Sequence, residues 1–274
     1  MNTTIGEIDS CRISPHDQAS SPEVATQEGL KPAVASSQLL DSGAAFELLD
    51  SEFELLLADS PVLLEQCYRL RHQVYCKEHH YESPAGRGAS LEMDAWDARS
   101  QQLLIRHRDT GFALATTRLI LSDDTDALQP FPAEYHAGID PAGFAGSAMF
   151  LPRHSIAEVS RFSISRAARS YLRDTGAIAS EVAERDLSSW ITLRLINGLV
   201  ELSRKHTVAQ WYTFMEGSFI RLLRRMGMCF EPVGAAIEFR GRRFVALDSV
   251  DALMRGMQRE RPELHGMMLE EAIS

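Results

Sequence analysis

The stretch "AEVSRFSIS", residues 157–165, decides the fold class, because it reads as a core strand that carries charges. Val159, Phe162 and Ile164 are typical of a buried strand. Glu158 and Arg161 stand among them, and a buried charge without a partner is costly. In a regular strand, Glu158 and Phe162 face one side of the sheet and Arg161 faces the other. The segment therefore predicts a strand that serves the core and a polar site at once.

The segments around this strand alternate between helical and strand patterns. Leu63, Cys67, Leu70 and Val74 recur at helical spacing and predict an amphipathic helix over about 61–76. The run "SQQLLIRHR", the turn "DTG" and the run "FALATTRLIL" predict an antiparallel hairpin. After the strand over 157–165 and a polar loop, we expect a helix over 186–206 with Asp186 as N-cap and a strand over 208–214. A helix over 217–227 follows and stops at Gly227. The last elements are a hairpin over 235–247 that turns near Arg240 and Gly241, and a helix over 249–258. This order predicts a mixed α/β domain with one parallel crossover from the strand over 157–165 to the strand over 208–214.

The N-terminal part of the chain differs in composition from the rest. Residues 1–60 hold eleven Asp or Glu against Arg12 and Lys31, whereas residues 61–274 hold 27 acids and 26 bases. The first 40 residues are rich in Ser, Pro, Gln and Ala, which is typical of disorder. We therefore predict a disordered acidic tail over 1–45, a lead-in strand or helix within 46–61, and a single domain over 46–274. The loop over 122–153 is long enough to be functional or mobile.

The composition excludes several classes of function. The nearly neutral body lacks the positive field that general nucleic-acid binding uses. No apolar run approaches the ~20 residues that span a bilayer, and the N-terminus lacks the features of a signal peptide, so we expect a cytosolic protein. Four cysteines in 274 residues do not form a disulfide framework. The segment "CKEHH" (76–80) has no second ligand pair at a finger-like spacing, so we expect no metal site.

Four clusters of polar residues interrupt otherwise apolar elements. They lie at the end of the first helix, in the segment "EMDAWD", in the strand "TTRLIL" and in the strand over 157–165. Their members are Arg71, Tyr75 and Tyr81; Glu92, Asp94 and Asp97; Arg118; and Glu158 and Arg161. Each cluster alone is explained by a solvated face or a structural ion pair. Together they indicate either a network that holds a charged substrate or a purely structural scaffold.

The segments "RHQVYCKEHHY" (71–81), "EMDAWDARS" (92–100), "TTRLIL" (116–121) and "EVSRF" (158–162) occur in an order that resembles the acyl-homoserine-lactone synthases and the N-acyl amino acid synthases. In those families an Arg-x-x-Val-aromatic segment, an Asp-x-x-Asp pair, an Arg-Leu strand and a Glu-x-x-Arg strand shape the active site. The positions that match are Arg71, Tyr75, Asp94, Asp97, Arg118, Glu158 and Arg161. Tyr81 stands where the lactone synthases usually have Trp, a departure from the version that uses S-adenosylmethionine.

A narrower resemblance covers about residues 61–250. The segments "RHQVYC", "DAWDARS", "LIRHRDTG", "EVSRFSIS", "SFIRLLRRMG" and "FRGRR" are similar to the PEP-CTERM/exosortase system-associated acyltransferases, which belong with the N-acyl amino acid synthases in the GNAT superfamily. The resemblance implies a GNAT-like (acyl-CoA N-acyltransferase) fold, with a mixed central sheet flanked by helices. It also implies a β-bulge in the strand over 157–165, which would bring Glu158 and Arg161 closer and free a backbone N–H for an oxyanion.

The reaction that the resemblance implies is transfer of a fatty acyl group from a phosphopantetheine thioester to the amine of an amino acid or related small molecule. Glu158 is the first candidate for the general base and Asp94 the second. The alternative for Glu158 is an ion pair with Arg161 or Arg71 that braces the strand. Transfer would be direct, without a cysteine nucleophile. The expected substrate contacts are Arg71, Tyr75, Tyr81, Asp97, Arg118, Ser160, Arg161 and Phe162, and one of the three arginines would bind the acceptor carboxylate.

Acyl carrier protein is the expected donor, and no permanently bound cofactor is expected. Relatives that use coenzyme A usually carry a Gln/Arg-x-x-Gly-x-Gly/Ala loop, which residues 166–187 lack. An acidic carrier protein requires a basic docking site, for which the alternative is an ordinary solvated surface. The candidates are Arg221, Arg224, Arg225 and Arg242, joined by Arg166, Arg169, Arg173, Arg240 and Arg243. The competing functions are a lactone synthase-like enzyme, an acyl-CoA-dependent GNAT enzyme, and a non-catalytic regulator that binds an acyl chain or carrier protein.

Overall fold

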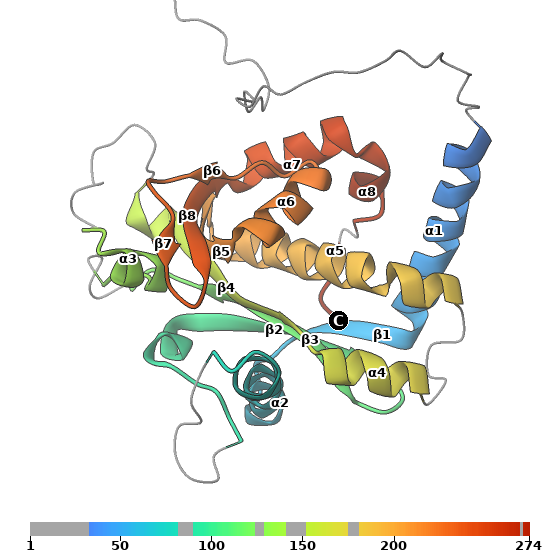
Figure 1. Cartoon of the computed structure of the whole chain (residues 1–274), viewed down its shortest axis with the longest axis horizontal. Helices are drawn as coiled ribbons and strands as arrows, with labels where there is room; N and C mark the ends of the chain where they lie inside the picture. Colours follow the sequence, from blue (N-terminus) through green and yellow to red (C-terminus); the bar gives the residue numbers. More distant parts are fainter. Residues whose placement is uncertain (1–32, 82–89, 124–128, 141–151, 175–180, 269–270) are drawn as a thin grey trace, which may run out of the picture.

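An eight-stranded mixed sheet forms the centre of the molecule, in the order β1-β2-β3-β4-β5-β8-β6, with β7 also paired to β8 (Figure 1). The computed structural model describes residues 33–81, 90–123, 129–140, 152–174, 181–268 and 271–274. The strands are β1 Phe53–Leu57, β2 Ser100–His107, β3 Ala113–Ile120, β4 Ile156–Ile164, β5 Gln210–Glu216, β6 Glu231–Pro232, β7 Ile237–Glu238 and β8 Arg242–Ser249. Among the described strands, β4 and β5 form the one parallel pair. The predicted fold class and parallel crossover are confirmed.

Helices cover both faces of this sheet. They are α1 Ala33–Glu52, α2 Pro61–His72, the π-helix η1 Gln73–Glu78, the 3-10 helix η2 Ala95–Arg99, α3 Pro132–Ala137, the 3-10 turn η3 Arg153–Ser155, α4 Arg166–Asp174, α5 Glu181–Lys205, α6 Gly217–Arg225, α7 Val250–Glu260 and α8 Pro262–Gly266. α2 begins as its sequence predicts, with Pro61 in the first turn and the Ser60 side chain accepting from the Leu63 N–H. None of the described helices has both the length and the apolar character needed to cross a membrane.

Three expectations about elements need correction. Residues 33–45 of the predicted tail belong to α1, which begins at Ala33, and Phe46 and Leu49 of this helix are buried in the core. Residues 1–32 lie outside the described part of the chain. The polar loop predicted after β4 contains α4, whose Ala168 and Leu172 are buried. Asp186 does not cap the long helix, because α5 already begins at Glu181.

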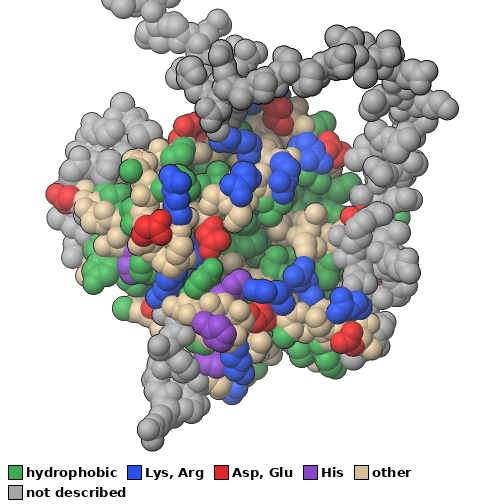
Figure 2. Space-filling view, viewed as in Figure 1, with side chains coloured by type: hydrophobic (Ala, Val, Ile, Leu, Met, Phe, Trp, Pro, Cys, Tyr) green, Lys and Arg blue, Asp and Glu red, His purple; other side chains and the backbone are tan. Residues whose placement is uncertain are grey.

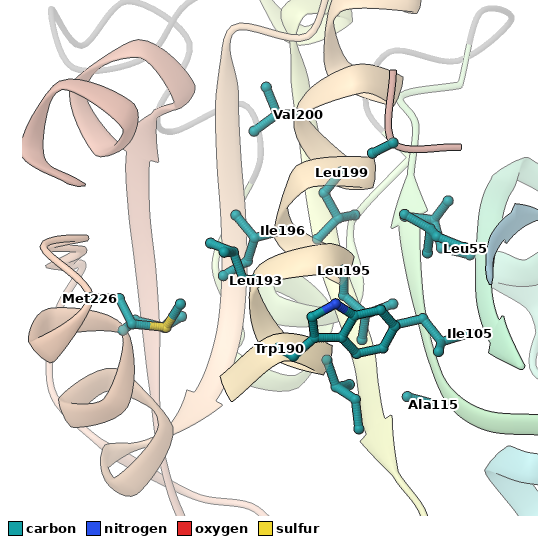
Figure 3. Close-up of a cluster of buried hydrophobic side chains, with 14 of the residues drawn as sticks. Leu55, Ile105, Ala115, Trp190, Leu193, Leu195, Ile196, Leu199, Val200 and Met226 are labelled. Atoms are coloured by element: carbon teal, nitrogen blue, oxygen red, sulfur yellow. The ribbon is translucent and has the colours of Figure 1, made fainter. Parts of the chain in front are cut away.

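The main core lies between α5 and the sheet (Figure 3). Leu103 and Ile105 of β2 pack in this cluster with Trp190, whereas the intervening Leu104 packs with Cys67 of α2. Side chains of a strand alternate between the two faces of a sheet. α5 and α2 therefore cover opposite faces.

β4 carries a bulge at its centre. Thr116 of β3 pairs with Ser163 and Arg118 pairs with Ser160, so two residues of β4, Arg161 and Phe162, lie opposite Thr117 alone. Arg161 has a left-handed φ of 54°. One extra residue reverses the alternation of every side chain beyond it. The predicted bulge is confirmed, and it explains how one strand can carry both core residues and charges.

The bulge sorts the charged and apolar residues of β4 onto different faces. Phe162 and Ile164 pack against the main core, together with Val159. Arg161 bonds instead to carboxylates near α2. β4 and β5 also separate beyond the pair Val159 and Thr213, where the parallel ladder between them ends. The strand therefore contributes to the core along its length and still opens onto a site at its middle.

Candidate active site

Three arginines and three carboxylates form a buried ion network beside β4. Arg71 of α2, Arg118 of β3 and Arg161 of β4 supply the cations, and the segment before and within η2 supplies Glu92, Asp94 and Asp97. The Arg71 and Arg118 side chains are fully buried. Because the charges balance in number, the network holds three guanidinium groups inside the molecule without a net charge.

Each arginine of the network bonds to two carboxylates. Arg71 donates from Nε to Glu92 (2.5 Å) and from Nη1 to Asp97 (2.6 Å). Arg118 donates to Asp94 at 2.7 and 2.8 Å and to Asp97 at 2.6 Å, and its Nε donates to Ser160 Oγ at 2.9 Å. Arg161 donates from Nη2 to Glu92 at 2.9 Å and to Asp94 at 3.0 Å. The network thus ties α2, η2, β3 and β4 together.

The turn that holds these carboxylates is itself built from two of them. Asp94 is the N-cap of η2, and its Oδ1 accepts from the Trp96 N–H. The Asp97 carboxylate accepts in return from the Asp94 N–H at 2.8 Å. This reciprocal capping box fixes the positions at which both acids meet the arginines.

The charges within the network hold Glu92 and Asp97 ionised. Burial alone would raise the pKa of Asp97, but hydrogen bonds and charge from Arg71 and Arg118 lower it to about 2. Burial likewise opposes ionisation of Glu92, and Arg161 and Arg71 still hold its pKa below the usual range. These acids are therefore charged at any physiological pH, which suits bracing and does not suit proton transfer.

A cavity of about 300 Å³ lies against the other side of the network. Its polar part is lined by Tyr75, Asp94, Trp96, Glu158 and Arg161. Its apolar part runs between β5, α5 and α6, where the lining residues are Ile196, Leu199, Trp211, Phe219, Leu223 and Phe230. The cavity thus joins a charged end on one face of the sheet to an apolar end under α5, through the region where β4 and β5 separate.

Glu158 differs from the acids of the network. It is fully buried, lines the cavity, and its Oε2 accepts the Ala133 N–H at 2.8 Å. Burial raises the pKa of Glu158 to about 8, and the Ala133 N–H and the charge of Arg118 offset only part of this effect. A carboxyl group that titrates near neutral pH inside a cavity has the properties of a general base or acid.

The structure separates the predicted site residues into two groups. Those that line the cavity are Tyr75, Tyr81, Asp94, Glu158, Ser160, Arg161 and Phe162. Arg71, Asp97 and Arg118 lie behind this lining, and their polar atoms bond to one another, as described above. Of the three arginines expected to bind an acceptor carboxylate, Arg161 is the one that faces the cavity. Its guanidinium also lies over the Tyr75 ring, 5.1 Å from the centroid.

Tyr81 lies beside Tyr75 in the cavity wall, with the ring centroids 6.4 Å apart. Its hydroxyl donates to Glu216 Oε1 at 3.3 Å, and Arg243 donates to the same oxygen at 3.1 Å. Its ring stacks on His79, with the centroids 5.1 Å apart. This cluster forms a polar border between η1 and the end of β5.

Some lining residues are not identifiable from the sequence motifs. His136 of α3 stacks on Phe239 with centroids 4.1 Å apart, and Trp96 lies 6.0 Å from His136. The tip of the hairpin formed by β7 and β8 brings Phe239 to this wall from more than 100 residues away in the chain. Glu92 bonds to two of the three arginines. Its position in the motif segment does not predict this role.

Most of the candidate docking arginines lie on the surface. Arg221, Arg224 and Arg225 of α6 and Arg242 of β8 are exposed, as are Arg166 and Arg173 of α4. Arg169 instead bonds to Ser188 Oγ, and Arg243 forms the ion pair with Glu216. Figure 2 shows basic side chains gathered on both sides of a largely apolar depression on this face. Within the described residues, no three His, Cys, Asp or Glu side chains gather as a metal site would require.

Comparison with known proteins agrees with this architecture. Residues 70–174 match a family model described as an acetyltransferase (GNAT) domain. No curated protein matches the chain significantly.

Several solved structures share the fold. The acyl-homoserine-lactone synthase LasI has a TM-score of 0.54 and 21% identity, covering 80% of this chain and 96% of that one. BjaI, a CoA-dependent acyl-homoserine lactone synthase solved with SAM and isopentyl-CoA, has a TM-score of 0.54 and 19% identity, covering 81% and 92%. FeeM, an N-acyl amino acid synthase from uncultured soil microbes, has a TM-score of 0.50 and 10% identity, covering 76% and 97%. At these identities the likeness shows a common fold, and with the GNAT domain match it indicates an acyltransferase.

Proposed function

We propose that this protein transfers a fatty acyl group from an acyl carrier protein thioester to the amine of an amino acid or a related small molecule. The observation that carries the proposal is the cavity, which joins a titratable carboxyl group, Glu158, to an apolar channel through the gap between β4 and β5. The apolar end suits an alkyl chain, and the polar end suits an amine. The thioester carbon would then lie beside β4, between the two.

Glu158 is the proposed general base. An ammonium group cannot attack a thioester, so the acceptor must give up a proton, which the Glu158 carboxylate accepts directly or through water. Asp94 is the weaker candidate, because its oxygens accept hydrogen bonds from both Arg118 and Arg161. Its acceptor positions are therefore already occupied by donors of the ion network.

The backbone of β4 supplies the proposed oxyanion site. Beyond Val159 the ladder with β5 ends, so N–H groups of β4 that face this side have no ladder partner from β5. One of them would bind the thioester oxygen as negative charge develops on it. The amine nitrogen then bonds to the carbonyl carbon, the carbon–sulfur bond breaks, and the products are an amide and a thiol. No covalent enzyme intermediate is needed.

The acceptor would contact the polar lining. Arg161 and Tyr75 are the proposed contacts for its polar groups, with Ser160 and Phe162 on the same strand and Tyr81 at the border. Arg71, Asp97 and Arg118 act as positioning residues. Arg118 and Asp97 hold Asp94, and Arg71 holds Glu92, which in turn bonds to Arg161. We expect a cytoplasmic enzyme with no resident cofactor, and the PEP-CTERM/exosortase resemblance remains a prediction about its context.

Lipid analysis of an expressing host tests this function. Hosts expressing the wild type and Glu158→Gln are extracted, and N-acylated amines are identified by mass spectrometry. We expect acyl amides that depend on the wild-type protein, and transfer from acyl carrier protein in a purified assay. If purified protein binds acyl thioesters but consumes none with any amine, it is a binding protein and the enzyme proposal fails.

The purified assay also distinguishes the competing enzyme classes. A lactone product from S-adenosylmethionine would identify a lactone synthase, and faster transfer from acyl-CoA than from carrier protein would identify a coenzyme A-dependent enzyme.

A further inference from the structure

The carboxylate of Glu78 occupies the N-terminus of α4. Its Oε2 accepts the Arg166 N–H at 3.0 Å, and its Oε1 accepts the Ala167 N–H at 3.2 Å and the Ser165 hydroxyl at 2.9 Å. The Glu78 side chain is only 9% exposed, although it lies beside the exposed Arg166. This acid comes from η1, 88 residues earlier in the chain.

The remaining donors at this helix terminus are also satisfied. The first N–H groups of a helix have no partner within the helix and usually turn to side chains, water or a ligand. Here the Ala168 N–H donates to Ser165 Oγ at 3.1 Å, and the Arg169 N–H donates to the Ser165 carbonyl at 3.2 Å. With Glu78 in place, the first turn of α4 retains no backbone donor for an incoming anion.

The π-helix explains how Glu78 reaches this position. In η1 the His79 N–H donates to the Val74 carbonyl, five residues earlier, at 3.0 Å. The widened turn lets Tyr75 line the cavity while Glu78, three residues later, points to α4. π-helical turns often occur at functional sites.

This helix terminus adjoins the lining of the cavity. The next residue after Glu78, His79, lines the cavity, and its Nε2 lies 3.3 Å from Arg166 Nη2. α4 follows β4 directly, and a helix N-terminus after a strand is a favourable place for a phosphate group. A thioester donor that enters the gap between β4 and β5 brings its pantetheine arm, and any phosphate attached to it, towards this point.

We propose that Glu78 is a specificity-determining residue that occupies the anion site of α4 and excludes donors that carry a pyrophosphate. Glu78 removes the N–H donors that would bind the diphosphate of coenzyme A, and it places a negative charge where that diphosphate would lie. A phosphopantetheine arm on a carrier protein ends in a single phosphodiester and lacks the diphosphate. The inference rests on the proposed use of a thioester donor, and it names the residue that distinguishes the two donor classes.

Binding measurements test this inference without turnover. Isothermal titration calorimetry would measure coenzyme A, pantetheine and inorganic pyrophosphate with the wild type, Glu78→Ala, Glu78→Gln and Asp174→Ala. Asp174→Ala is the matched control, because it removes an exposed acid from the other end of the same helix. Pantetheine is the control ligand, because it lacks phosphate. Glu78→Gln removes the charge and keeps an acceptor oxygen for α4, so it answers the question if Glu78→Ala does not fold.

The expected result is tighter binding of coenzyme A and pyrophosphate to the Glu78 variants by about 10- to 100-fold, as new charge-assisted hydrogen bonds to the freed donors would give. Pantetheine affinity and the Asp174→Ala variant should match the wild type. The inference is overturned if folded Glu78 variants bind coenzyme A no better than the wild type, or if pantetheine affinity rises equally. These binding results do not depend on turnover, so they can hold even if the protein transfers no acyl group and the proposed function fails. Conversely, if carrier-dependent turnover is normal but coenzyme A binds the Glu78 variants no better than the wild type, only this inference is overturned.

Discussion

Replacing Glu158 by Gln tests the chemistry at the cavity, because Gln keeps the size of the side chain and an acceptor for the Ala133 N–H but cannot take a proton. Loss of a general base typically costs about 10²–10⁴ in rate, or about 3–5.5 kcal/mol of transition-state stabilisation. We expect kcat to fall by that amount with the preferred donor and amine. The pH profile supplies a second readout, since the pKa of Glu158 is raised to about 8. Wild-type kcat/KM should rise about tenfold from pH 6 to 7 and level off above pH 8, and the residual activity of the variant should lack that limb.

Stability should move in the opposite direction to activity. In the folded state the pKa of Glu158 is about 8, against a usual value of 4.5, so between these values the folded protein holds a proton that the unfolded chain has lost. The stability that this group contributes is therefore complete below about pH 4.5 and is lost as pH rises towards 8. Gln does not ionise. The free energy of unfolding of Glu158→Gln should therefore rise relative to that of the wild type by up to about 1.4 kcal/mol per pH unit across this window. Urea unfolding at pH 5.5 and 8 measures the difference.

The control is Glu134→Gln, which alters a buried acid that bonds to Arg153 rather than lining the cavity. It should destabilise the protein and leave turnover per folded molecule near that of the wild type above pH 8, while the acid limb of the profile persists and moves to lower pH because the Glu134 charge helps to raise the pKa of Glu158. The reasoning is refuted if Glu158→Gln turns over normally per folded molecule, or if it only loses stability as Glu134→Gln does. In either case Glu158 would be a structural acid.

Three further predictions concern the network, the surface and the cavity. Asp97→Asn should lower the free energy of unfolding by about 3–5 kcal/mol, because it leaves Arg71 and Arg118 buried with fewer anions, whereas the exposed change Asp174→Asn should have little effect in the same urea titration. Because the pKa of Asp97 is lowered to about 2 from 3.8, its contribution to stability is complete above about pH 4 and is lost as pH falls through 2, so acid unfolding of Asp97→Asn should lack that component. Changing Arg221, Arg224 and Arg225 together to Glu should raise KM for carrier protein and leave KM for an acyl-pantetheine mimic unchanged. Added salt should likewise raise the KM of the wild type for carrier protein. The matched control changes Arg204, Lys205 and Arg255 to Glu. The α6 helix is not the docking surface if the α6 variant slows transfer from carrier protein and from the mimic equally, or if its rates with both donors equal those of the control. Leu199→Phe should shift the preferred acyl chain to a shorter length in a competition assay, and an unchanged preference would show that the chain lies elsewhere.

The sequence predicts the architecture well because periodicity reports which face of an element is buried. The helix at α2, the hairpin of β2 and β3, the crossover between β4 and β5 and the turn at Arg240 and Gly241 are all confirmed. α4 is not predictable in the same way, because its apolar contribution rests on few residues, Ala168 and Leu172 among them, within a segment dense in arginine. The start of α1 escapes prediction because its first residues resemble a disordered tail in composition.

Motif order identifies the site residues, but their roles depend on contacts that spacing does not fix. A motif places Arg71 and Arg161 near the site, yet only the packing of α2 shows that Arg71 lies behind the cavity wall while Arg161 faces it. Glu78 stands within the motif segment 71–81, but nothing near it in the sequence indicates its partner, a helix 88 residues away. The bond between them depends on a π-helical turn, for which local sequence gives no clear signal.

The short seam between β4 and β5 has a mechanical consequence. Four residue pairs, from Ile156 and Gln210 to Val159 and Thr213, join the two halves of the sheet, and beyond them the halves are spanned by α5. A sheet normally gains stability from every added ladder bond, whereas this one lacks part of a central ladder beside the cavity. Under the proposed function, an alkyl chain in that space would replace strand-to-strand contact with its own apolar surface, so the bound acyl chain would be a temporary part of the hydrophobic core. Release of the amide product would then require local unpacking of the core rather than a simple dissociation from a surface.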